Sequence, residues 1–506
     1  METDWQPKPG DKFIRRPFRA HPLRRALGIF GLFSAGYGNV GSSIYYALGL
    51  VALIALGATP VVLVIAGIFF IFTALSYAEG TAMMPEAGGS ASFARHGFND
   101  LVGSVTGWAL AFSYIVTIAI SAYTAPAYLG YFWGALSGPA GGTIAAMGIV
   151  FFLMCLNILG VKESSILNTA FAVLDVLTQV LIIFLAILFI FAPHPEIFSG
   201  NVLANWPSME GLVLGIAIAT IAYTGVETIS QLSEETRRPR VSAPRALIML
   251  IAVVMVLFIG ISVAGFSTMT PTEMAIDWAR DPIAGIAAGL SATIVPTEVA
   301  TSGVAIFILD GILQLLPILV AILAATILII AANAGLMGIS RLTFSLGRFQ
   351  FVPLTLSRVH RKFKTPYPAI ILFSAMAILL LVPGFLPQVF PNFFVMLGSL
   401  YVFGSLLAFS LAHASILKLR VKEPDLSRPF KPRGNITVRG YELPLYAILG
   451  VVVTAAIWLT VVITQPYACW VGLGWMASGL IFYLLFRRRK KLPLVKTAPE
   501  IEVPLS

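Results

Sequence analysis

The sequence predicts an all-α integral membrane protein with twelve transmembrane helices. Three observations predict this class: 58% of the 506 residues are apolar, only 11% are charged, and the mean hydropathy is +0.90. Soluble domains carry roughly 25% charged residues, and a soluble chain of this length would need that polar surface on several domains. The composition therefore excludes a soluble enzyme and a disordered chain.

The predicted spans are apolar stretches of about 20 residues or more, which is the length that an α-helix needs to cross the hydrocarbon core. The first of them is long and rich in glycine, which indicates a break in that helix. The twelve predicted spans cover residues 27–56, 60–84, 101–130, 141–160, 165–192, 209–233, 243–268, 312–340, 367–386, 391–417, 442–464 and 467–486.

The distribution of basic residues predicts the orientation. If the N-terminus lies inside, all of the 33 Lys and Arg residues except Arg280 fall on the same side of the membrane. Such an excess of basic residues is typical of the cytoplasmic side, so we expect a plasma-membrane protein with both termini cytoplasmic. The net charge of +10 is spread between apolar segments instead of forming one patch, which argues against a nucleic-acid partner.

The polar segments between the spans predict the remaining organisation. In the outer segment 269–311, apolar patches at 283–295 and 303–309 indicate short helices over the outer mouth, and we expect the tail after Lys491 to be disordered. The predicted parts are an N-terminal cytoplasmic arm (1–26), a first repeat (27–192), a second repeat (209–417), a polar cytoplasmic loop (418–441), the last two spans (442–486) and a cytoplasmic tail (487–506).

Two of the spans contain residues that fit poorly in a continuous helix. Residues 36–41 hold three glycines and an asparagine, and the sixth span has Gly225 in its middle, followed by Glu227. Irregular backbone within a membrane persists only where it lines a cavity or meets a ligand. Breaks in the first and sixth spans are typical of a five-plus-five inverted repeat that binds its ligand at the midplane. The alternative is close helix packing by small residues.

At these residues the sequence resembles the amino acid–polyamine–organocation family of transporters. The resemblance covers about residues 27–486, with Ser43, Arg238 and Phe349 departing from the family pattern. It rests on a first-helix motif at Gly41-Ser42-Ser43-Ile44-Tyr45, a sixth-helix motif at Ile221–Glu227 continued by Glu234, Glu235, Pro239, Arg240 and Pro244, a second-helix motif at Tyr77-Ala78-Glu79 with Pro85, Gly88 and Gly89, an eighth-helix exit at Ser340, Arg341, Arg348 and Pro353, and the run Pro424–Lys431.

The resemblance implies a leucine-transporter-like fold and a secondary transporter without a cofactor. Amide groups at the start of the second half of helix one would bind the carboxylate of an amino acid, and carbonyls freed at both breaks would bind its ammonium. Side-chain specificity would come from helices three, six and eight. The expected substrate-binding residues are Gly38, Asn39, Val40, Gly41, Ser42, Ser43, Ile44, Ala222, Tyr223, Thr224 and Gly225.

Acidic residues inside spans are costly and therefore suggest function. Asp175 in span five and Glu227 after the second break are the candidates for proton coupling, with a structural role as the alternative for each. Glu79, near the inner end of span two, fits a structural role better. Span eight offers Thr326 and Asn333 but no adjacent pair of hydroxyls, which favours proton coupling or exchange over sodium coupling.

Several alternatives remain open at this point. Within the same superfamily, the substrate is either an amino acid or a polyamine or other organic cation. A membrane enzyme would need clustered His, Asp or Cys at a membrane face, and a channel would need a re-entrant filter loop. The sequence contains no Walker-type motif for a nucleotide. The partners it predicts are a small-molecule substrate, protons and lipids, and it does not predict the oligomeric state.

Overall fold

The computed structural model describes residues 27–160, 165–294, 303–356, 358, 360, 362–363 and 365–496. Helices dominate these residues, and eleven stretches are long and apolar enough to cross a membrane. The first stretch, Ile29–Met83, has 55 residues and contains two of the predicted spans. The predicted all-α membrane class is therefore confirmed. The predicted arm 1–26 lies outside the described residues.

The elements follow the chain in the order that the hydropathy predicts. The first half contains α1 (Ile29–Val40), η1 (Gly41–Ser43), α2 (Ile44–Ala55), η2 (Leu56–Ala58), α3 (Thr59–Met83), α4 (Ser90–Gly97), α5 (Asp100–Leu129), η3 (Gly134–Leu136), α6 (Pro139–Leu159), α7 (Ser165–Ala186), the π-helical turn η4 (Ile187–Phe191) and α8 (Pro195–Ala204). The second half contains α9 (Met209–Ala219), η5 (Thr220–Tyr223), α10 (Glu227–Gln231), η6 (Leu232–Glu235), α11 (Pro239–Thr268), α12 (Pro271–Ile276), α13 (Pro282–Ile294), α14 (Gly303–Arg348), α15 (Tyr367–Leu381), η7 (Val382–Phe385), α16 (Phe393–Lys422), β1 (Asn435–Val438), β2 (Tyr441–Pro444), α17 (Leu445–Thr464) and α18 (Pro466–Arg489).

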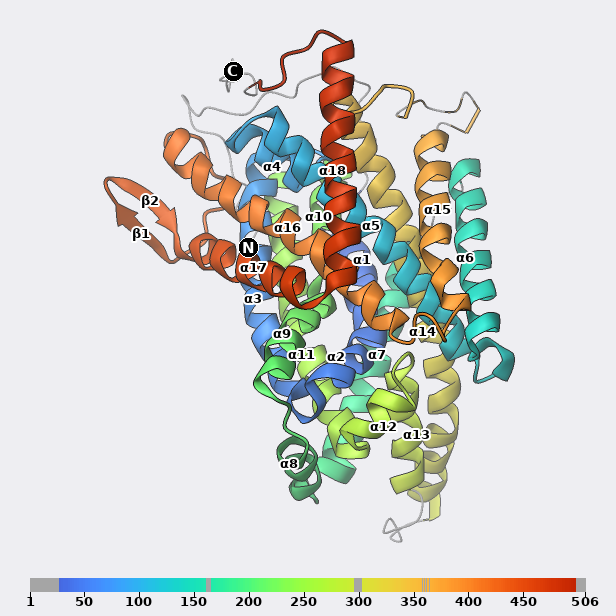
Figure 1. The fold of residues 1–506 in the computed structure, drawn as a ribbon. Helices are drawn as coiled ribbons and strands as arrows, with labels where there is room; N and C mark the ends of the chain where they lie inside the picture. Colours follow the sequence, from blue (N-terminus) through green and yellow to red (C-terminus); the bar gives the residue numbers. More distant parts are fainter. Residues whose placement is uncertain are drawn as a thin grey trace.

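Burial separates central from peripheral helices. The most apolar window of α5 is 89% buried, whereas those of α17 and α18 are 22% and 17% buried. Accordingly, α5 packs against α14 and α16, and α3 packs against α11. Figure 1 shows α8, α12 and α13 gathered at the end of the bundle opposite the last turn of α18. This end is the predicted outer mouth.

The outer segment packs closely on the bundle. A capping box formed by Thr270 and Glu273 starts α12, because each side chain accepts from the other's backbone amide. The carbonyl of Ala279 lies so close to Gly49 in α2 that a Cβ there would be 2.2 Å from the oxygen. The predicted helix at 283–295 is present as α13. The apolar patch at 303–309 is not a separate short helix, because α14 begins at Gly303 and continues through Asp310.

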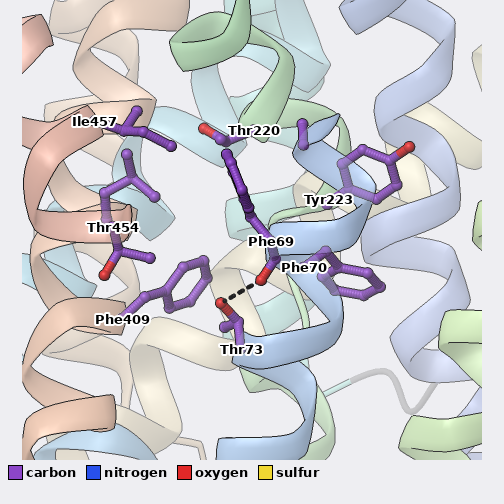
Figure 2. Close-up of a pocket in the computed structure, with 10 residues that line it drawn as sticks. Phe69, Phe70, Thr73, Thr220, Tyr223, Phe409, Thr454 and Ile457 are labelled. Atoms are coloured by element: carbon purple, nitrogen blue, oxygen red, sulfur yellow. Dashed lines mark hydrogen bonds between the residues drawn. The ribbon is translucent and has the colours of Figure 1, made fainter. Parts of the chain in front are cut away.

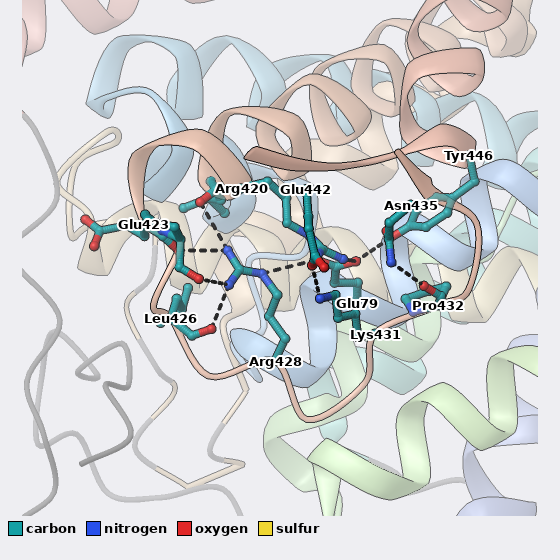
Figure 3. Close-up of polar contacts among 12 residues, drawn as sticks. Glu79, Arg420, Glu423, Leu426, Arg428, Lys431, Pro432, Asn435, Glu442 and Tyr446 are labelled. Carbon is teal, nitrogen blue, oxygen red and sulfur yellow. Dashed lines mark hydrogen bonds and ion pairs between the residues drawn. The ribbon is translucent and has the colours of Figure 1, made fainter. Parts of the chain in front are cut away.

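The prediction of a polar loop over residues 418–441 is wrong in part. Its first residues continue α16 to Lys422, and its end contains β1, which pairs with β2 as an antiparallel hairpin. Arg428 holds the residues between them, because its guanidinium donates to the carbonyl of Glu423 over 2.8 Å and lies 3.5 Å from Glu79. At the end of α16, Arg420 donates to both oxygens of Glu79 over 2.7 and 2.8 Å (Figure 3). The expected structural role of Glu79 agrees with this contact.

The beginning of the predicted cytoplasmic tail is also ordered. Residue Arg487 belongs to α18 and is 2% exposed, because its guanidinium bonds Asp100 over 2.9 Å and the carbonyl of Pro493. The backbone amide of Asp100 donates to the carbonyl of Lys496. The expectation of disorder directly after Lys491 is therefore wrong for residues up to 496, and residues 497–506 lie outside the described part.

Candidate functional site

The sixth predicted span is interrupted between η5 and α10. Thr224 is extended, with φ −79° and ψ 155°, and Gly225 has a φ of +111° before the helix resumes at Glu227. L-residues rarely adopt that conformation. A Cβ on Gly225 would also lie 2.8 Å from the side-chain amide of Asn39. Glycine is required here because segment six turns at the point where it meets segment one.

The interruption in segment one has a different form. Residues Val40, Gly41 and Ile44 all keep right-handed helical dihedrals, and the break is a single 3₁₀ turn. The amide of Gly41 donates to the carbonyl of Tyr37, and the amide of Ile44 donates to that of Gly41. The prediction that the amides of residues 41–44 are free donors is thus wrong for these two amides in this conformation.

The hydroxyls of Ser42 and Ser43 are occupied as well. Both donate to the carbonyl of Asn39, over 2.9 and 3.5 Å. Serine side chains compete with the backbone for its own hydrogen bonds, and here they take up the carbonyl that was expected to be free for an ammonium group. The side chain of Tyr223 also points elsewhere, since its hydroxyl donates to the carbonyl of Leu63 in α3.

All of the predicted site residues are buried, and the two interrupted segments meet through Asn39. Its amide nitrogen donates to the hydroxyl of Thr228 over 2.8 Å. The amide of Gly225 donates to one carboxylate oxygen of Glu227 over 3.1 Å. The other oxygen of Glu227 and the amide oxygen of Asn39 have no hydrogen-bond partner within the described residues. The junction therefore presents two unpartnered buried acceptors.

Three buried tyrosines lie where the charge of Glu227 acts on them. The sequence did not predict this cluster. They are Tyr77 of α3, Tyr114 of α5 and Tyr401 of α16, and each lies within the Coulombic reach of Glu227. Serine and threonine hydroxyls lie near them without hydrogen-bond geometry, so the three tyrosine hydroxyls are unpartnered in the part of the chain that the structure describes. Only Tyr77 has a sequence signal, because it opens the Tyr-Ala-Glu motif.

Asp175 of α7 lies across the interruption in segment one. It accepts a hydrogen bond from Tyr37 over 2.6 Å and another from Tyr45. Tyr37 lies on α1, before the interruption, and Tyr45 lies on α2, after it. Gln179, one turn along α7, donates to the same carboxylate over 2.9 Å. A single buried carboxylate thus connects both halves of the first span.

Gly41 makes this arrangement possible. A Cβ at that position would lie 2.6 Å from the ring of Tyr37. The glycine lets the ring lie over the 3₁₀ turn and reach Asp175. Packing therefore explains Gly41 in this conformation, which is the alternative to direct ligand contact that the sequence left open.

A small cavity with both polar and apolar lining residues borders the junction. Its lining includes Thr228 and Gln231, and both polar atoms of the buried Gln231 amide have no partner within the described residues. Arg341, which pairs with Glu235 over 2.7 Å, lies in the same lining. Beside this cavity, Glu234 and Glu235 pair with two arginines of α14, since Arg348 also bonds Glu234 over 2.6 Å.

A second, apolar hollow lies behind the interruption. Figure 2 shows Phe69, Phe70, Tyr223, Phe409 and Ile457 around it. The side chain of Thr220 from η5 also faces it. This small hollow lies between η5 and the helices α16 and α17.

The candidates for a cation site in span eight are engaged elsewhere. The hydroxyl of Thr326 donates to the carbonyl of Ile322 in its own helix. The amide oxygen of Asn333 accepts from Asn157 of α6 over 2.5 Å.

The sequence profile of the amino acid permease family matches residues 27–485, almost the whole length of the helical bundle. The chain belongs to the amino acid permease family. It is 30% identical to the branched-chain amino acid permease BcaP of Bacillus subtilis, over 92% of this chain and 94% of that protein. It is 26% identical to the methylthioribose transporter of Bacillus subtilis, over 94% and 96%. It is 24% identical to the low-affinity putrescine importer PlaP of Escherichia coli, over 87% and 88%. The family resemblance predicted from the motifs is confirmed, and the chain is a membrane transporter.

Proposed function

We propose that this permease is a secondary active transporter of amino acids that works by alternating access and is coupled to protons. The observation that carries the proposal is the set of unpartnered polar atoms around Gly225. Buried polar groups are rarely left without hydrogen bonds, and each such group calls for an explanation. A zwitterionic substrate supplies the missing partners for both kinds of group at this junction.

The junction has the donors and acceptors that an amino acid requires. The free oxygens of Glu227 and Asn39 accept from the substrate ammonium, and the hydroxyls of Tyr77 and Tyr114 donate to its carboxylate. This assignment replaces the free amides of helix one in the conformation described above. The residues 38–44 and 222–225 remain the backbone frame of the proposed site.

The cavity beside Gln231 marks the start of the route that we propose from this site to one side of the membrane. Its border with Thr228 and its closure by the Arg341–Glu235 pair fit a passage that opens when α1 and α10 move away from α14. We further propose that residues 27–192 and 209–417 form inverted repeats that carry this motion. The basic residues lie at the cytoplasmic face of the plasma membrane, and both termini are cytoplasmic.

Uptake into proteoliposomes tests the substrate class. Reconstituted protein is offered labelled branched-chain, aromatic and cationic amino acids, and putrescine in parallel, with and without an imposed proton gradient. We expect saturable uptake of at least one amino acid that the gradient accelerates, and loss of that uptake in Glu227→Gln. Uptake of putrescine alone would replace the amino acid by a diamine, a substrate whose ammonium groups also suit the free oxygen of Glu227.

A further inference from the structure

The β1–β2 hairpin presents one apolar face that the described part of the chain leaves partly exposed. In its register, Ile436 pairs with Leu443 and Val438 pairs with Tyr441. Side chains of directly opposed residues lie on the same face of a hairpin, and positions two apart along a strand share that face. All four residues therefore lie together. Ile436, Val438 and Tyr441 are 41%, 43% and 40% exposed.

The opposite face fixes the hairpin to the bundle. It carries Thr437 and Glu442, and Glu442 pairs with Lys431 and lies 3.8 Å from Arg420 (Figure 3). The neighbouring charge of Lys431 holds the pKa of Glu442 below its usual value, so this face is anchored through an ionised carboxylate. The apolar face accordingly points away from the ion pairs.

The position of the hairpin in the chain brings it to the level of the membrane surface. The apolar span α17 begins at Leu445, directly after the last residue of β2. Exposed apolar side chains continue along that helix at Leu445, Leu449 and Val452. Figure 1 shows the hairpin projecting sideways from the bundle, next to the start of α17. A two-stranded hairpin is marginally stable by itself, so an apolar face exposed to water would be a further liability.

Two arginines flank the apolar face. Arg439 occupies the two-residue turn with Gly440, with φ values of +51° and +85°, and Arg433 precedes β1. Both are exposed, and neither makes a hydrogen bond or ion pair within the described residues. Basic residues beside an apolar surface bind anionic headgroups, and a tyrosine such as Tyr441 is typical of the membrane interface.

We propose that the hairpin is an interfacial anchor. Its apolar face, Ile436, Val438, Tyr441 and Leu443, enters the boundary between headgroups and acyl chains, while Arg433 and Arg439 bind the phosphates of anionic lipids. The anchor holds the end of α16 and the start of α17 at one depth in the membrane. It does not depend on which solute the permease carries.

Depth-dependent quenching tests the anchor in the full chain. Cys155 and Cys469 are replaced by serine, and an environment-sensitive fluorophore is attached to Val438→Cys or, as the matched control on the other face, to Thr437→Cys. Both proteins are reconstituted in phosphatidylcholine with phosphatidylglycerol and with lipids that carry a quencher near the headgroup. We expect quenching and a shift of emission to shorter wavelength at position 438 and neither at position 437.

The arginines are tested in the same system. The double variant Arg433→Gln, Arg439→Gln should show less quenching at position 438. The protein that keeps both arginines should show the same decrease in membranes of pure phosphatidylcholine. An equal signal at positions 437 and 438 would refute the anchor. The anchor would also be refuted if the label at position 438 were not quenched and unlabelled Val438→Cys formed crosslinks between two copies at high protein density. That result would show that a second copy covers this face. A second probe at Ile436→Cys and an unchanged size-exclusion profile show that the labelled hairpin is still folded.

Discussion

At the scale of single residues, two positions govern the meeting of the interrupted segments. Gly225 has a backbone conformation that only glycine adopts easily, and it lies against the amide of Asn39. Asp175 connects Tyr37 and Tyr45 on either side of the turn in segment one. The first position sets the shape of the proposed site, and the second connects both halves of helix one to α7.

We expect Gly225→Leu to abolish substrate binding while the protein still inserts. The left-handed backbone alone costs a non-glycine residue roughly 1–2 kcal/mol, and the side chain would displace Asn39. Substrate binding to the purified variant measures the effect. Gly148→Leu is the control, because nothing lies within 4 Å of a Cβ at that position. Normal transport by Gly225→Leu would show that the site lies elsewhere.

We expect Asp175→Asn to uncouple uptake from the proton gradient and to leave substrate exchange largely intact. The asparagine keeps the shape of the side chain but remains uncharged, so it cannot carry a proton between the two sides. Initial uptake rates with and without a pH gradient measure the coupling. The neighbouring Thr178→Ala is the control, since that hydroxyl bonds only the carbonyl of Leu174 in its own helix. An unchanged pH dependence in Asp175→Asn would leave the carboxylate a structural role and move the coupling to Glu227.

At the scale of elements, the ends of the helices are held by buried charges outside the proposed site. Glu79 joins α3 to α16 through Arg420, and the hydroxyl of Tyr446 of α17 bonds the same carboxylate. At the end of the bundle predicted to face outward, Asp281 lies between α12 and α13, and its charge acts on Tyr128 of α5. Both interactions connect a peripheral element to the central helices, so the thermal stability of variants tests both.

Removing one partner of the Glu79–Arg420 pair should destabilise the protein strongly. Breaking a buried ion pair typically costs about 3–5 kcal/mol, because the remaining charge is left buried without compensation. Thermal unfolding in detergent should show a large drop in Tm for Glu79→Gln and for Arg420→Met. The double variant should recover part of the loss, since neither member of the pair is left alone and Arg428, which lies 3.5 Å from Glu79, keeps its bonds to the carbonyls of Leu426 and Glu423. A double variant whose loss equals the sum of the single losses would contradict this account.

The outer segment should be more stable in acid. Burial raises the pKa of Asp281 to about 6, against the opposing effect of Arg280. Because the packed segment favours the protonated carboxyl, its stability is highest below the ordinary pKa of about 4 and declines as the pH rises through about 6. We expect the Tm of the wild type to fall over that range by roughly 2–4 °C more than that of Asp281→Asn. Parallel pH curves for the two proteins would refute this assignment.

At the scale of the whole molecule, the spans and the basic residues predict how the bundle lies in the membrane. Arg433 and Asp277 are both exposed, and they lie in segments expected on opposite sides. In a background without Cys155 and Cys469, a membrane-impermeant thiol reagent added to intact cells should label Asp277→Cys and leave Arg433→Cys unlabelled until the cells are opened. Labelling of Arg433→Cys from outside would overturn the orientation and place the hairpin at the outer face.

The sequence by itself determined the membrane class, the family, the bounds of nearly every span to within a few residues, and the two places where a helix is interrupted. These properties are local, since hydropathy and glycine content depend on neighbouring residues in the chain. The apolar patch 303–309 predicts a separate short helix, but the helix that begins at Gly303 continues through Asp310 as α14.

The tertiary structure alone decided which side chains meet. Asp175 and Tyr37 are 138 positions apart in the chain, and Tyr77, Tyr114 and Tyr401 lie on three different helices but all feel the charge of Glu227. It also decided that segment one turns through a 3₁₀ turn with its Gly41 and Ile44 amides bonded, while segment six unwinds. The physical reason is that these contacts depend on the rotation and crossing of packed helices, which the periodicity within any one helix does not specify.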